Sequence, residues 1–110
     1  MKIYKVGDKV NLTLKLYDSN ASLFVRAKVF DKDFSLFGTF SLIHVISGLY
    51  RYELNGLLAG SYYVIYEIYK DSGYNNKDKN YSEAEESFSV ETNLEELITN
   101  KADENDGRAI

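Results

Sequence analysis

Apolar and polar side chains alternate with a period of two along most of residues 3–90. In the stretch KVNLTLKLYD, Val10, Leu12 and Leu14 alternate with polar side chains. A period of two places neighbouring side chains on opposite faces, which is the pattern of a β-strand buried on one side. Similar runs are separated by turn-forming residues, and they cover approximately residues 23–30, 39–46, 49–54, 61–70 and 84–90, with a short edge strand at 3–6.

These runs follow one another without an intervening helical period, and this excludes most fold classes. A parallel sheet needs crossover connections long enough for helices, and the connections here are too short for them. Short strands with frequent turns are instead typical of two packed antiparallel sheets. We therefore predict an all-β fold, an antiparallel immunoglobulin-like β-sandwich of six to seven strands over residues 1–91.

The sequence departs from this pattern in two places. Residues 71–80 read DSGYNNKDKN and predict a polar, mobile loop. Residues 92–110 predict a short helix over about 93–100, followed by a flexible, charged C-terminal tail. Thr92 and Glu95 have the spacing of a capping box, which starts a helix. The apolar side chains of this helix share one face, and they are Leu94, Leu97 and Ile98.

Charge and composition limit the classes of partner. The chain has 17 acidic and 13 basic residues, a net charge of −4 and no basic stripe, so we expect no nucleic-acid partner. It has no cysteine, which excludes disulfides and thiolate metal sites. No apolar run has the length of a signal-peptide core or a membrane span. We expect synthesis in a cytoplasm, with no signal peptide and no membrane partner.

Residues suited to catalysis are few. His44 is the single histidine, and no cysteine or second histidine is present to complete a transition-metal site with it. No serine occupies a G-x-S-x-G elbow, and a triad base would have to be His44 itself. Acidic residues cluster at 31–33, 83–86 and 103–106, but paired carboxylates need a partly desolvated cleft to act as acid and base. We therefore expect a protein that is not an enzyme and has no cofactor or metal, and a carboxylate-dependent hydrolase is only a third hypothesis.

The predicted strand at 61–70 is rich in tyrosine and has two largely apolar faces. The face that we assign to the core consists of Tyr62, Val64, Tyr66 and Ile68. The opposite face consists of Tyr63, Ile65, Glu67 and Tyr69. Two interpretations of this second face remain open. Either a central strand has tyrosine hydroxyls that reach solvent at the sheet margin, or the face is a docking surface shared with Phe24 and Phe30.

Several phrases occur in an order that resembles a known class of protein. They are VGDKVNLTLKLYD, LFVRAKVFDKD, SLIHVISGLYRYEL, AGSYYVIYEIYKDSGY and YSEAEESFSV, over about residues 3–91. They resemble small immunoglobulin-like domains that are encoded in the structural regions of phages and prophages. The resemblance implies a non-enzymatic structural or adaptor subunit of a virion, a tail or a phage-like particle. It also implies an oligomer in the assembly, with other structural subunits as partners.

Sheet edges, the C-terminal helix and the tyrosines are the candidate contact surfaces. In a particle subunit, a sheet edge would accept a neighbour by strand addition, and the helix at 93–100 would enter a groove of a neighbour. The alternative for this helix is that it covers the sandwich end of its own domain. The alternative function is a glycan- or receptor-binding module that uses Tyr63, Tyr69 and Tyr74 with the loop at 71–80, because aromatic rings stack on sugars and sandwich-end loops are common recognition sites.

Overall fold

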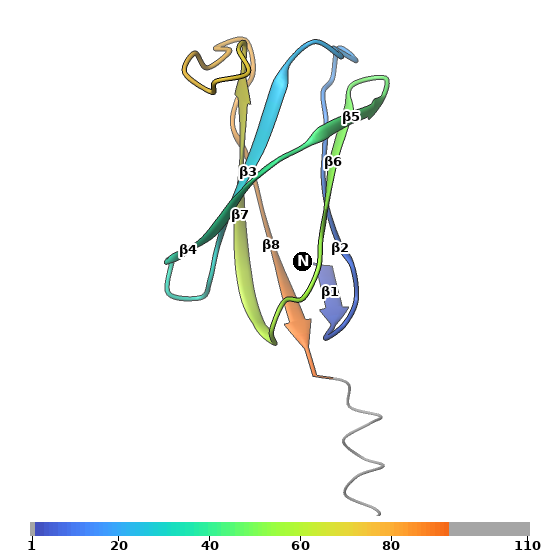
Figure 1. Cartoon of the computed structure of the whole chain (residues 1–110), viewed down its shortest axis with the longest axis vertical. Coiled ribbons are helices and arrows are strands. Elements are labelled where there is room, and N and C mark those ends of the chain that lie inside the picture. Colours follow the sequence, from blue (N-terminus) through green and yellow to red (C-terminus); the bar gives the residue numbers. More distant parts are fainter. Residues whose placement is uncertain (1, 93–110) are drawn as a thin grey trace, which may run out of the picture.

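A computed structural model of the chain describes residues 2–92 and contains two β-sheets packed face to face (Figure 1). The strands are β1 (Lys2–Lys5), β2 (Val10–Lys15), β3 (Phe24–Phe30), β4 (Leu36–Ser41), β5 (Ile43–Ile46), β6 (Leu49–Leu54), β7 (Gly60–Tyr69) and β8 (Ala84–Glu91). One sheet has the order β1-β8-β7-β3-β4 and the other has the order β2-β6-β5. The predicted all-β immunoglobulin-like sandwich is confirmed, with eight strands and with one parallel pair, β1 and β8.

The period of two in the sequence places one side of each central strand in the core between the sheets. The strand residues that are buried there are Val10, Leu12, Val25, Ala27, Val29, Tyr50, Leu54, Tyr62, Val64, Tyr66, Ile68, Phe88 and Val90. The core assignment for one face of β7 is therefore confirmed. Burial of each large apolar side chain contributes about 1.5–3 kcal/mol before entropy losses, so this layer is the main source of stability.

The single strand predicted at 39–46 is wrong, because the structure divides this segment into β4 and β5. The division falls at Leu42, whose side chain is buried in the core and whose amide donates to the carbonyl of Val25 over 2.8 Å. After Leu42 the chain leaves β3 and pairs with β6, so the segment crosses from one sheet to the other (Figure 1). The change of sheet at Leu42 thus gives the sandwich one more strand than a single run over 39–46 would.

The polar loop predicted at 71–80 is folded back against the sheet that contains β7. The Lys70 amide donates to the carbonyl of Asn76 over 2.8 Å, and the Asp78 amide donates to the carbonyl of Ile68 over 2.9 Å. The Asp71 carboxylate accepts the Asn76 amide over 2.9 Å, so a side chain satisfies the turn. These bonds order the loop over the outer face of β7.

Candidate functional site

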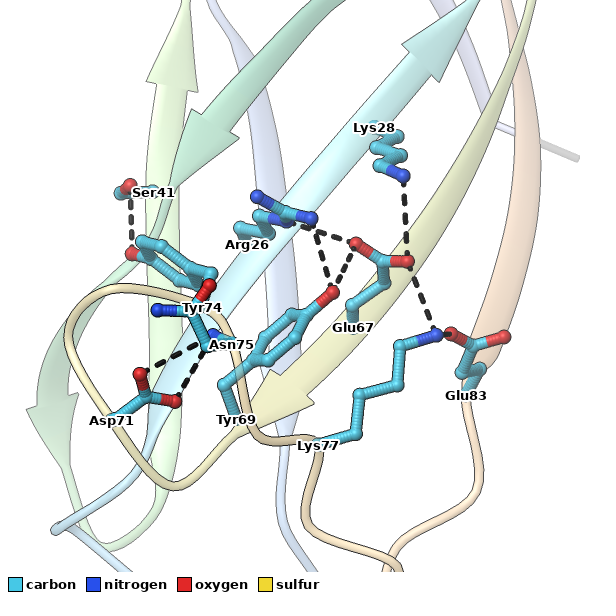
Figure 2. A network of polar contacts seen from close by, with 10 residues as sticks. All are labelled: Arg26, Lys28, Ser41, Glu67, Tyr69, Asp71, Tyr74, Asn75, Lys77 and Glu83. Atoms are coloured by element: carbon cyan, nitrogen blue, oxygen red, sulfur yellow. Dashed lines mark hydrogen bonds and ion pairs between the residues drawn. The ribbon is translucent and has the colours of Figure 1, made fainter.

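The outer face of β7 holds a buried carboxylate within a cluster of positive charges (Figure 2). Glu67 is only 5% exposed, and its Oε1 accepts hydrogen bonds from Arg26 Nε over 2.9 Å and from the Tyr69 hydroxyl over 3.0 Å. Its Oε2 lies 3.6 Å from Lys28 Nζ and 3.4 Å from Lys77 Nζ. Strand pairing between β3 and β7 places Arg26 directly opposite Glu67. We call these five residues the Glu67 cluster.

The electrostatics of the Glu67 cluster favour the ionised form of the carboxylate. Burial acts to raise the pKa of Glu67, but the hydrogen bonds from Arg26 and Tyr69 and the charge of Lys28 outweigh it and hold this pKa below its ordinary value. A general acid or base needs a pKa near the working pH and an approach for substrate. Glu67 has neither, so its role is to hold β3, β7 and the loop at 71–80 together.

Two of the three tyrosines predicted to form a recognition site, Tyr69 and Tyr74, pack against Arg26 of the Glu67 cluster. The Arg26 guanidinium lies 4.9 Å from the ring centre of Tyr69 and 5.1 Å from that of Tyr74. The Tyr74 hydroxyl donates to Ser41 Oγ over 2.7 Å (Figure 2). The Tyr69 ring contacts Arg26 and Tyr74 and is buried by them. It therefore leaves almost no surface for a partner.

Tyr63 lies near the opposite end of β7 from Tyr69, so the three tyrosines do not form one surface. Its ring contacts Phe34, with the centroids 5.8 Å apart in an edge-to-face arrangement. Phe34 and Tyr63 border a hollow of about 230 Å³, and a groove of about 430 Å³ lies on the adjacent side of Tyr62. The other predicted contact residues, Leu94, Leu97 and Ile98, lie outside the described residues.

Phe34 has an unusual backbone conformation for an aromatic residue. Its φ is 60°, in the left-handed region that favours glycine. The turn is closed by the Phe34 amide, which donates to the carbonyl of Asp31 over 3.0 Å, and by the Asp31 amide, which donates to the carbonyl of Ser35 over 3.0 Å. The phenyl ring is nevertheless largely exposed. A strained residue with an exposed ring indicates a position that is not optimised for stability.

The strain at Phe34 predicts a difference between two substitutions that both remove the ring. We expect Phe34→Gly to be more stable than Phe34→Ala by about 1 kcal/mol, because only glycine adopts a positive φ without cost. Chemical denaturation of the two variants measures this difference. Equal free energies of unfolding would show that the backbone at this turn is unstrained.

His44 and Glu83, two residues considered above as candidates for catalysis, each have a close partner within the described part of the chain. His44 Nε2 accepts the Gly48 amide over 3.0 Å, and its ring packs edge-on against Tyr50. Glu83 pairs with Lys77 over 2.6 Å. Residues 2–92 contain no group of three or more His, Cys, Asp or Glu side chains that could hold a metal ion. Within the same residues, no helix is long and apolar enough to cross a membrane.

The most distinctive surface is a set of exposed apolar side chains along β4 and β5. These strands are the last strands of the two sheets on the same side of the sandwich. We define the apolar edge as the residues Leu36, Phe37, Ile43, Val45 and Ile46, which are between 48% and 71% exposed. The exposed polar residues Thr39 and Ser41 lie between the apolar pair at 36–37 and the apolar residues at 43–46. Several large apolar side chains exposed along one side of a domain indicate an interaction site.

The two sides of the sandwich differ in how their free edges are protected. Free strand edges in soluble proteins commonly carry lysine, because a charge opposes pairing with another chain. On the side opposite the apolar edge, β1 carries Lys2 and Lys5, and β2 ends at Lys15. In contrast, residues 34–50 include no Asp, Glu, Lys or Arg. Sequence inspection could have found this uncharged stretch, but only the strand order shows that it forms an edge.

Comparisons with known proteins support the fold but not an activity. No family model matches the sequence, and no curated protein matches it at a significant level. A similar solved structure is a crystal structure of a "putative glycoside hydrolase" from Bacteroides vulgatus, with 14% sequence identity and a TM-score of 0.57. The similarity covers 84% of this chain and 17% of that chain, so this chain spans a small part of the other protein's length. At this identity the likeness concerns the fold alone.

Proposed function

We propose that this chain is a non-enzymatic structural or adaptor subunit of a phage or phage-like particle, and that the apolar edge contacts neighbouring subunits. The observation that carries the proposal is the uncharged, exposed edge of β4 and β5 beside lysine-bearing edges on the other side. The particle is supported by the phrases in the sequence that resemble phage and prophage structural domains.

The physical basis of the contact is the burial of apolar side chains that water now surrounds. Removing apolar surface from water contributes roughly 25 cal/mol for each Å² that is buried. The rigid sandwich behind the edge lowers the entropic cost of association, because the Glu67 cluster and the core already order the strands. Such an edge suits a module that binds neighbouring subunits rather than an enzyme that acts on a substrate.

A charge on the apolar edge is expected to prevent incorporation into particles. Ile43 is 71% exposed on β5, and Ile3 is 61% exposed on β1, so Ile3→Lys is a matched control for Ile43→Lys. We expect the wild-type chain to co-sediment with particles from its source bacterium after prophage induction. Incorporation should fall at least tenfold for Ile43→Lys, because an interface would desolvate the unpaired ammonium group, and should remain unchanged for Ile3→Lys.

Two results would contradict this function. The wild-type chain would remain entirely outside the particle fraction, or the two lysine variants would enter particles equally well. Thermal unfolding of both variants checks that neither substitution disrupts the fold, and exposed positions usually change stability by less than about 0.5 kcal/mol.

The groove beside Tyr62 favours a second candidate function, recognition of a glycan or receptor. It is lined on one side by the turn at 31–33 and on the other by the connection from β6 to β7. Phe37 contributes an exposed ring to this lining, and aromatic platforms bury large area at small entropic cost. Glycan-array binding that is lost in Phe37→Ala and retained in Ile43→Lys would favour recognition over the particle contact.

A further inference from the structure

We infer that the apolar edge pairs with the same edge of a second copy of this chain, with β4 antiparallel to β4 about a two-fold axis. This inference rests on the proposed function, because it names the partner of the same surface. Closed two-fold pairs use one patch on both subunits, so the patch must be complementary to itself.

The backbone of β4 has hydrogen-bonding groups that point away from its own sheet. In an antiparallel pair, every second residue turns its amide and carbonyl toward the neighbouring strand. The Leu42 amide bonds to the carbonyl of Val25, and the register from this pair continues through Arg26 opposite Ser41. Thr39 and Ser41 therefore direct their amides and carbonyls toward the free side of β4.

The positions of these free groups determine how two copies would align. A pairing that uses both residues on both chains places Thr39 of one copy opposite Ser41 of the second copy. Continuing in the antiparallel direction, the start of β4 in one copy approaches β5 in the other. The same register places Phe37 of one copy opposite Ile43 of the second copy, and both residues are about half exposed or more in the single chain.

Charge favours a second copy at this edge and disfavours one at the β1 edge. In a two-fold pair each strand meets its own sequence, so any charged residue near the axis meets a like charge. Pairing of β1 with β1 would bring Lys2 and Lys5 together, whereas β4 and β5 carry no charged side chain. Two copies with a net charge of −4 each repel one another elsewhere. Two copies can therefore approach one another at the apolar edge without bringing like charges together.

Sedimentation equilibrium of the full-length chain tests this pairing. We expect a dimer at micromolar to millimolar concentrations, with the dissociation constant raised at least tenfold by Ile43→Lys and unchanged by Ile3→Lys. A wild-type chain that stays monomeric throughout this range overturns the inference. An equal effect of both variants also overturns it, because self-association would then not involve the apolar edge.

Disulfide trapping tests the alignment, since the natural chain has no cysteine to interfere. A mixture of Thr39→Cys and Ser41→Cys chains is expected to form the mixed dimer under mild oxidation, because opposed residues of a hydrogen-bonded pair lie about 5.5 Å apart. An Asn11→Cys chain, exposed on β2, serves as the control. Random cross-linking of all three cysteines to similar extents would reject the alignment.

Failure of this inference and failure of the proposed function are distinguishable. A monomeric chain whose incorporation into particles is still lost in Ile43→Lys rejects pairing between copies, while the apolar edge remains the contact for a different subunit. A chain that dimerises through the apolar edge but never enters particles supports the pairing between copies and contradicts the proposed particle function.

Discussion

Replacing Glu67 with alanine is expected to lower the free energy of unfolding by about 3 kcal/mol, because removing one partner of a buried ion pair leaves the other uncompensated. The Arg26 side chain is largely buried and would lose its 2.9 Å bond to the carboxylate. Lys28, 3.6 Å from Oε2, would then face Arg26 without a balancing charge, whereas Lys77 would keep its pair with Glu83. Urea denaturation measures this loss of stability, provided that the dependence of the unfolding free energy on urea concentration has the same slope in both proteins.

Glu53→Ala is the matched control for this substitution. Glu53 is also a strand glutamate, and it pairs with Lys9 over 3.5 Å, but both side chains are largely exposed to solvent. Exposed ion pairs contribute about 0–1 kcal/mol, so the control should change stability little. A loss for Glu67→Ala no greater than that for Glu53→Ala would show that the Glu67 cluster does not hold the fold together.

The effect of Glu67→Ala should depend on pH in a defined direction. The folded protein holds the pKa of Glu67 below its ordinary value despite burial, because Arg26 and Tyr69 donate to the carboxylate. The stabilisation is therefore complete above the unfolded pKa of about 4.3 and is lost as the pH falls through the lower folded pKa. The difference in stability between wild type and Glu67→Ala is expected to be constant near neutral pH and to shrink below about pH 4.

Replacing Gly48 with alanine is expected to destabilise the fold by about 3 kcal/mol, the second large effect. Gly48 closes the two-residue turn between β5 and β6 with a φ of +78°. A Cβ atom there would lie 2.6 Å from the Cα and 2.8 Å from the carbonyl carbon of Ser19, which are backbone atoms that cannot rotate away. The positive φ costs about 1 kcal/mol, and overpacking against backbone adds about 1–3 kcal/mol.

Gly56→Ala separates these two contributions. Gly56 has a similar φ of +75°, but a Cβ atom at this position would meet no atom within 4 Å. We therefore expect a loss of about 1 kcal/mol for Gly56→Ala and a clearly larger loss for Gly48→Ala, by equilibrium denaturation. Equal losses would show that the loop at Ser19 moves aside without cost.

Alternation predicts which face of a strand is buried, but not where that strand lies in its sheet. Tyr62 and Val64 could be assigned to the core because a period of two needs no knowledge of neighbours. The same alternation places Glu67 on the opposite face but does not indicate its partner, because Arg26 is 41 residues away and reaches it only through the pairing of β3 with β7.

The apolar edge escaped prediction for a related reason. Residues 39–46 have the alternation of one strand, and the change of sheet at the buried Leu42 has no separate sequence signal. Strand order depends on long-range pairing, so the same apolar run can be central and covered or lateral and exposed. The burial of Tyr69 could not be predicted either, since its ring is covered by Tyr74, and the position of Tyr74 depends on how its loop folds back.

Amide hydrogen exchange at two protein concentrations tests most directly whether the β4 and β5 side of the sandwich is a contact surface. The amides of Thr39 and Ser41 should exchange rapidly in dilute solution and become protected in concentrated solution, while the edges of β1 and β2 do not change. Exchange at Thr39 and Ser41 that is independent of concentration, together with new protection at β1 or β2, would place the contact on the wrong side of the sandwich and contradict the account.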